Sequence, residues 1–175
     1  RSWRVRTRAE ESFTAVLRVD GLAPATEYRY RVEVDGQAAR VGKGTFRTCP
    51  RQGAPVKVSV AFGGGAGFVP EYEHMWNVIA GRRPHALLML GDNVYIDDPE
   101  HPLTQHYCYR RRQSRPEWRS LVADTAVYAI WDDHDFGTND CTSNLPLDDP
   151  PWKLDVLGVF KQNWANPGYG EGAVH

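Results

Sequence analysis

The sequence predicts an α/β domain that follows a shorter all-β segment, and two patterns separate these parts. Residues 13–48 alternate apolar with charged side chains and contain Asp-Gly pairs, which is typical of antiparallel hairpins. From residue 56 onward, continuous apolar runs alternate with stretches of helical period, which indicates strand–helix–strand units. The polar residues 51–55 contain Gly and Pro and predict a linker. We therefore expect one domain over residues 1–50 and a second over 56–175.

The composition is that of an ordinary globular protein. Of the 175 residues 41% are hydrophobic and 25% are charged, and the net charge of −1 gives no indication of nucleic-acid binding. No apolar run approaches the roughly 18 residues that a membrane span needs. Cys49, Cys108 and Cys141 are too few and too widely spaced for a zinc ribbon or a disulfide framework, and their odd number leaves at least one thiol free.

Strands separated by turns are predicted in the first part. Residues 13–19 and 26–34 carry the alternation of a sheet with one wet face, and Asp35-Gly36 predicts a tight hairpin turn. The stretch Leu22–Tyr28 resembles the L-x-P-x-T-x-Y corner of fibronectin III-like sandwiches. Because such a sandwich needs about seven strands, we interpret residues 1–50 as the end of an all-β fibronectin III-like sandwich.

Strands and helices alternate in the second part. Strands are predicted over 56–62, 86–90 and 126–131, and helices over 71–81, over 104–123 with an interruption near Pro116, and over 152–164. The strands are continuous apolar runs, so we expect a sheet that is covered on both faces.

Acidic side chains are concentrated after two of these strands. Asp132–Asp135, read Asp-Asp-His-Asp, directly follows the last strand, and Asp92 and Tyr95 follow strand 86–90. Both loops are expected at the carboxyl edge of one sheet, where sites in α/β folds are built. Clustered carboxylates at the end of a buried strand need counter-charge, and a metal ion supplies it compactly. A solvated acidic turn is the alternative.

Three further features have alternative interpretations. Tyr95 is either an oxygen ligand for a ferric ion or a packed loop aromatic. The arginines of residues 110–119 either grip phosphate through their guanidinium groups or form a solvated helix face. The tract Gly63–Gly67 offers backbone amides to a phosphate, but it matches neither Gly-rich nucleotide fingerprint.

Taken together, these motifs resemble the metallophosphoesterases, and most closely their alkaline phosphatase D-like branch. The likeness rests on Phe62–Gly65, Gly91–Tyr95 and Trp131–Asp135 in that order, supported by His106–Arg111. It spans about residues 22 to 164. The resemblance implies a partial metallophosphoesterase-type α/β/β/α sandwich, of which the second part of the chain would be the N-terminal half.

The resemblance also implies a role for each motif residue. Asp92 matches a carboxylate that bridges two metal ions, and Tyr95 matches the tyrosine ligand of an iron-type centre. Asp133 stands in the ligand position that Asn holds in the commoner Gly-Asn-His form. His134 matches the histidine that faces the phosphate and donates to the leaving oxygen, with Asp135 orienting it. The implied cofactor is a binuclear centre of Fe and/or Ca, Mn or Mg, which hydrolyses small phosphate mono- or diesters.

Two departures qualify this expectation. Gly65 stands where a cysteine ligand is expected, and the histidine ligands of the later half of the fold are absent because the sequence stops at His175. We therefore expect a chain that is cut at both ends and incomplete for catalysis. The rival interpretation is a non-catalytic protein that binds partners or polymer and has a degenerate metal or phosphate site. An extracytoplasmic location follows from the resemblance alone, and substrate-binding residues and oligomeric state are not predicted.

Overall fold

The computed structural model describes residues 2–142 and 149–170, and it contains an antiparallel hairpin followed by a parallel α/β sheet. This confirms the predicted fold class. In chain order the elements are β1 (Glu27–Val34), β2 (Gln37–Arg47), β3 (Val60–Gly63), the short 3-10 helix η1 (Pro70–Tyr72), α1 (Met75–Gly81), β4 (Ala86–Leu90), α2 (Pro102–Gln113), α3 (Pro116–Asp124), β5 (Ala126–Ile130), α4 (Asp133–Phe136) and α5 (Lys153–Asn163).

The hairpin of β1 and β2 turns where the sequence predicts it. Asp35 and Gly36 both have positive φ, 50° and 79°, which is the backbone that a two-residue hairpin loop requires. Tyr28 stacks on Phe46 of the opposite strand, with ring centroids 5.6 Å apart. The Tyr28 hydroxyl accepts a hydrogen bond from the backbone N–H of Ala23 at 2.8 Å, so it fixes the corner that precedes β1.

The strand predicted over residues 13–19 is wrong, because this stretch has no regular structure. Ser12 and Phe13 form a tight turn with positive φ, and the Phe13 N–H donates to the carbonyl of Arg8 at 2.8 Å. Val16 and Leu17 are exposed. An alternating pattern becomes a strand only when a neighbouring strand pairs with it, and none of the described segments does so here.

The hairpin lies against the C-terminal end of α3. The Tyr30 hydroxyl donates to the carbonyl of Ala123 at 3.1 Å, and the Thr45 N–H and hydroxyl both donate to Asp124 Oδ1, at 2.7 and 2.9 Å. A Cβ added at Gly44 would lie 2.2 Å from the Ala123 carbonyl oxygen, so only glycine permits this approach. The division into domains at residues 51–55 stays a prediction.

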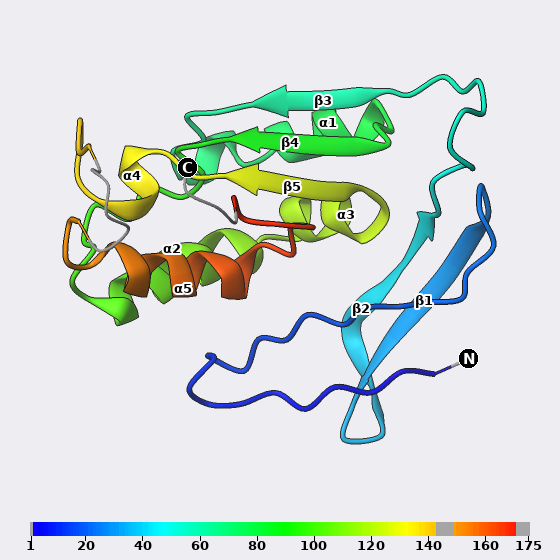
Figure 1. Ribbon diagram of the computed structural model, residues 1–175, viewed down its shortest axis with the longest axis horizontal. Coiled ribbons are helices and arrows are strands. Elements are labelled where there is room, and N and C mark those ends of the chain that lie inside the picture. The colour runs from blue at the N-terminus through cyan, green and yellow to red at the C-terminus, as the bar shows by residue number, and fades with distance from the viewer. Residues whose placement is uncertain (1, 143–148, 171–175) are drawn as a thin grey trace.

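The three-stranded sheet has the order β3-β4-β5, and all its strands are parallel. Their carboxyl ends therefore point to one edge, where α4 follows β5 (Figure 1). The predicted strand 56–62 forms only from Val60 onward. Pro116 begins α3, which confirms the predicted interruption of the second helical region.

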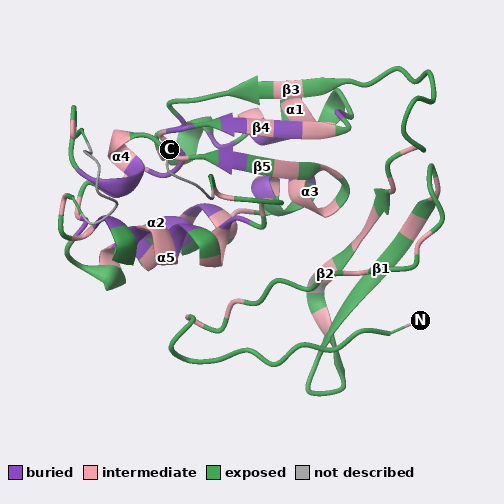
Figure 2. Ribbon diagram, viewed as in Figure 1, coloured by how far each residue is buried: buried purple, intermediate pink, exposed green. Residues whose placement is uncertain are grey.

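Only one face of this sheet is covered by the described residues, so the prediction of two covered faces is wrong for them. Leu87, Met89 and Ala129 point into a core formed with residues of α1, α2, α3 and α5. The opposite face presents Phe62, which is 72% exposed. By the strand register, four further exposed residues lie on this same face: Val60, Leu90, Tyr128 and Ile130. Figure 2 shows β3 largely exposed, whereas the buried residues gather in β4, β5 and the helices. The apolar runs were sufficient for a strand but could not show which layers pack on it.

Candidate metal centre

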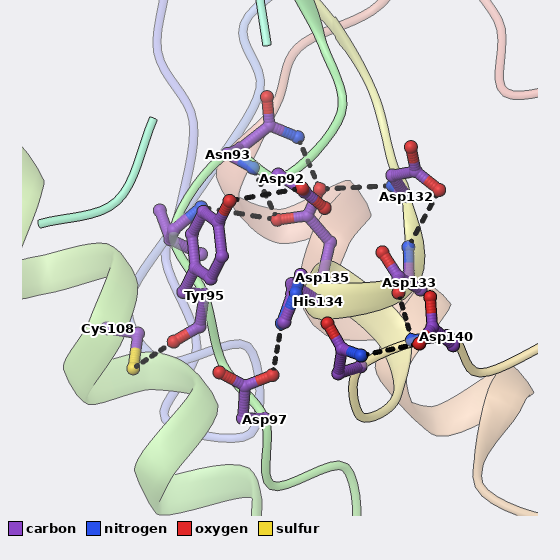
Figure 3. A network of polar contacts seen from close by, with 12 residues as sticks. Asp92, Asn93, Tyr95, Asp97, Cys108, Asp132, Asp133, His134, Asp135 and Asp140 are labelled. Atoms are coloured by element: carbon purple, nitrogen blue, oxygen red, sulfur yellow. Dashed lines mark hydrogen bonds and ion pairs between the residues drawn. The ribbon is translucent and has the colours of Figure 1, made fainter. Parts of the chain in front are cut away.

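Three loops meet at the carboxyl edge of the parallel sheet. We call them the glycine tract (residues 63–67, which begins with the last residue of β3), the Asp92 loop (residues 91–97, after β4) and the Asp133 loop (residues 131–140, after β5). Figure 3 shows the side chains of the last two loops converging from opposite sides.

The Asp133 loop begins with a capped helical turn. Asp132 is the N-cap of α4, its carboxylate accepts from the Asp133 N–H at 2.9 Å, and Asp135 completes a capping box. This turn leaves the side chains of Asp133 and His134 directed to the site while Trp131 and Phe136 pack together beside it. The carboxylate of Asp133 also accepts from the Asp140 N–H at 2.5 Å, which closes the loop on itself.

Asp135 joins the Asp133 loop to the Asp92 loop. Its carboxylate is fully buried; Oδ1 accepts from the N–H groups of Asn93 and Val94, at 2.7 and 3.2 Å, and Oδ2 accepts from the Asn93 side chain at 2.8 Å. Burial raises the pKa of Asp135 to about 7, although the backbone N–H donors, of which the first is that of Asp132, favour the charged form. Asp135 is therefore a structural tie, with its oxygens directed away from His134.

Asp92 is held in a strained backbone conformation. Its φ is 52°, and Tyr95 and Asp97 in the same loop have φ of 53°, a region that residues with a Cβ rarely adopt. Gly91, with φ of 94°, precedes them, and a Cβ there would lie 2.6 Å from the Cβ of Asp132. Only glycine therefore lets the two loops approach so closely.

The potential metal ligands lie together at this point. One ligand atom from each of Asp92, Asp133 and His134 lies within 4.8 Å of the others. Asp92 Oδ1 is buried and has no protein partner, whereas Oδ2 accepts from the Tyr95 hydroxyl at 3.2 Å. A buried carboxylate oxygen without a donor is costly, and a cation would satisfy it. The residues present therefore fit a metal ion.

Gly65 lies next to the same group. A Cβ added there would have the Tyr95 hydroxyl as its nearest neighbour, at 3.8 Å. The position is thus open towards the ligands, but its φ of 67° favours glycine and it offers no side-chain donor. Partial burial, followed by the charge of Asp92, raises the pKa of Tyr95, so without a cation it is a neutral phenol that donates to Asp92.

His134 is oriented by Asp97, which corrects the expectation that Asp135 does so. The His134 Nδ1 lies 2.5 Å from Asp97 Oδ1, and the Tyr95 ring lies over the imidazole with centroids 4.3 Å apart. The pairing leaves Nε2 as the nitrogen available to a substrate or ion. The hydrogen bond to Asp97 raises the pKa of His134, which favours the imidazolium.

One arginine of the predicted basic cluster, Arg112, is buried instead of solvated. It is 3% exposed and pairs with Glu73, which is 1% exposed. The sequence pattern did not reveal its role, nor that of Asp97, because both pair with residues far away along the chain. The three cysteines are free, and Cys108 lies behind the site, where its Sγ faces the Tyr95 carbonyl at 3.7 Å.

Comparison with known proteins supports the fold. No protein-family model matches the chain, and no curated protein matches it. Among solved structures, one described as the structure of PhoD matches with a TM-score of 0.74 and 16% sequence identity, over 98% of this chain. The chain shares the fold of PhoD. It spans 38% of the length of that PhoD chain, and at this identity the likeness concerns the fold alone.

The lengths and hydropathy of the helices bear on membrane spanning. Within residues 2–142 and 149–170, no helix of this PhoD-like fold is both long and apolar enough to cross a bilayer.

The pairing of His134 with Asp97 predicts a change in titration. In the metal-free chain, Asp97→Asn should lower the pKa of His134, because the carboxylate that stabilises the imidazolium is lost. NMR titration of the histidine ring protons would measure it. Asp98→Asn is the matched control, since Asp98 pairs with His101 and should lower only the pKa of that residue. A His134 pKa that is unchanged in Asp97→Asn would contradict the pairing.

Proposed function

We propose that this chain carries part of a metal-dependent phosphoesterase site, which acts on small phosphate mono- or diesters. The observation that carries the proposal is the meeting of Asp92, Asp133 and His134, of which Asp92 has a buried carboxylate oxygen, Oδ1, without a protein partner. The fold shared with PhoD supports it. The assignment of residues 56–175 to one half of a catalytic domain, and an extracytoplasmic location, belong to the same proposal.

Three side chains are proposed to hold the metal. Asp92 would contribute to both ions of a binuclear centre, Tyr95 would bind a ferric ion as a phenolate, and Asp133 would bind through a carboxylate oxygen. Oxygen ligands suit Ca²⁺, Mn²⁺ or Mg²⁺ at the second position. When bound, the ions would supply positive charge at the phosphoryl oxygens. These donors suffice for one ion, so we expect weak binding of a single ion and no turnover from residues 1–175 alone.

His134 is proposed as the proton donor to the leaving oxygen. Its Nδ1 pairs with Asp97, and the imidazolium that this pairing favours has a proton to donate at Nε2. The Tyr95 ring, which is tilted by 32° from the imidazole plane, lies close enough to limit rotation of the imidazole. Because Nδ1 is paired and the ring is restricted, the proton that His134 can donate is the one on Nε2. Protonation of a leaving oxygen requires a donor with such a fixed direction.

A non-catalytic metal- or phosphate-binding protein is the second candidate. The observation that favours it is Gly65, because the backbone position beside the Tyr95 hydroxyl offers no ligand. This candidate predicts ion binding without hydrolysis in any longer form of the protein, and no loss of function when His134 is replaced.

Asp92→Asn tests the metal site. Loss of the charge that faces the cation should abolish detectable Mn²⁺ binding to residues 1–175, measured by the electron paramagnetic resonance of free Mn²⁺. Asp98→Asn removes a carboxylate close in sequence that lies outside the ligand group, and it should leave binding unchanged. Wild-type affinity in Asp92→Asn would refute the site as assigned.

His134→Ala separates a proton donor from a ligand. In a longer form of the protein that hydrolyses aryl phosphates, the variant should keep its metal content while the maximal rate falls by roughly 10²–10⁴, the range for losing a positioned acid. Elemental analysis and steady-state rates measure the two quantities. Metal lost in parallel with the rate would make His134 a ligand, and an unchanged rate would exclude it from the reaction.

A further inference from the structure

Arg112 is a buried cation whose surroundings connect it to the site. Its Nε lies 3.0 Å from Glu73 Oε2, and that oxygen also accepts from Trp76 Nε1 at 3.0 Å. The guanidinium stacks over the Trp76 ring, 5.0 Å from its centroid. The buried carboxylate of Glu73 thus contacts both Arg112 and, through Trp76, helix α1.

The remaining nitrogens of Arg112 reach two of the three loops of the site. Nη2 donates to the carbonyl of Ala66 at 2.7 Å, and Nη1 donates to the carbonyl of Asn93 at 3.3 Å. Ala66 directly follows Gly65, and Asn93 directly follows Asp92. One guanidinium therefore bonds both to the glycine tract and to the Asp92 loop, each at the residue after one that has positive φ.

The two loops also bond to each other next to Arg112. The Ala66 N–H donates to the Asp92 carbonyl at 2.9 Å, and the Gly65 N–H donates to the Gly91 carbonyl at 3.2 Å. Left-handed backbone at a residue with a Cβ persists only when its surroundings hold it there. On the side of Asp92 that faces the glycine tract, two interactions hold the backbone. They are the pair of backbone hydrogen bonds just described and the Arg112 guanidinium, which bonds to both loops.

Stability alone does not account for this arrangement. A buried ion pair is often no more stabilising than apolar side chains of the same volume, because both charges lose their hydration. What apolar side chains cannot do is donate to two carbonyls on separate loops. The planar guanidinium does so in fixed directions while it remains paired to Glu73.

We propose that Arg112, held by Glu73, is a positioning residue for the metal site, which keeps the glycine tract against the Asp92 loop and so fixes the direction of the Asp92 carboxylate. The inference rests on the proposed metal site for its effect on binding, although the loop contact itself does not depend on a metal. It differs from both alternatives that the sequence left open for this arginine, a grip on phosphate and a solvated helix face, since Nε, Nη1 and Nη2 each face a buried protein oxygen.

Two readouts on residues 1–175 test this, with Arg112→Met combined with Glu73→Gln as the main variant. The double change removes both buried charges and leaves an oxygen for Trp76 Nε1. We expect amide hydrogen exchange at Ala66 to accelerate without metal, while exchange in α5 stays slow. We also expect Mn²⁺ to bind 10–100-fold more weakly, the usual effect of losing a partner behind the ligands.

The controls separate positioning from folding and from the proposed function. Arg115→Met removes a guanidinium of a part-exposed pair with Glu117 and should alter neither readout. Arg112→Lys keeps the charge beside Glu73 but cannot donate to both carbonyls, so the Ala66 amide should again exchange faster even if the double variant does not fold.

Wild-type protection of the Ala66 amide in Arg112→Lys, or wild-type Mn²⁺ affinity in a folded double variant, would overturn the inference. Failure of the wild-type chain to bind Mn²⁺ would refute the proposed function, and the exchange readout would still decide the loop contact.

Discussion

The site depends on one buried carboxylate, that of Asp135. It accepts hydrogen bonds from the Asn93 and Val94 N–H groups, from the Asn93 side chain and from the Asp132 N–H, so it joins the loops after β4 and β5. Without this tie, bonds between the loops would remain at the far end of the Asp92 loop, where the Ile96 N–H donates to the His134 carbonyl at 2.8 Å and Asp97 pairs with His134. Asn93, next to Asp92, would lose its bonds to the Asp133 loop, and we expect the Asp92 carboxylate to lose its fixed position opposite Asp133 and His134.

A second tie works from the other side of the Asp92 loop. The Arg112 guanidinium and the Ala66 N–H attach the glycine tract to it, and Asp97 attaches it to His134. The Asp92 loop is thus held at three points, which is consistent with its three non-glycine residues at positive φ. Strain of this kind persists only where the surroundings impose it. Here two of the strained residues, Asp92 and Tyr95, are proposed ligands, and the third, Asp97, pairs with His134.

The sequence predicted the features that local patterns encode. The continuous apolar run of β4 forms a strand with the expected bounds, Pro116 separates α2 from α3, and Asp35-Gly36 forms the hairpin turn, because each depends on residues close together along the chain. The convergence of Asp92 and Asp133 was also predictable, since the ends of parallel strands share one edge.

What the sequence did not reveal depends on pairings across the fold. Residues 13–19 alternate like a strand, but none of the described segments pairs with them. The apolar sheet face that contains Phe62 is open. A strand's own residues could not predict this, because they do not show which layers pack on the strand. The sequence did not distinguish Asp97 from the other acidic residues of its loop, whereas the structure places it against His134. Arg112 looked like a member of a charged helix face until its burial against Glu73 became visible.

The central claim is that a cation binds between the Asp92 and Asp133 loops. The most direct measurement is paramagnetic broadening of amide NMR signals when substoichiometric Mn²⁺ is added to the ¹⁵N-labelled chain. The account predicts that broadening is strongest at Gly65, Asp92, Asn93, Asp133 and His134, with the hairpin of β1 and β2 unaffected. Broadening centred on acids outside the ligand group, such as Asp20 or Asp98, or none at all, would contradict it.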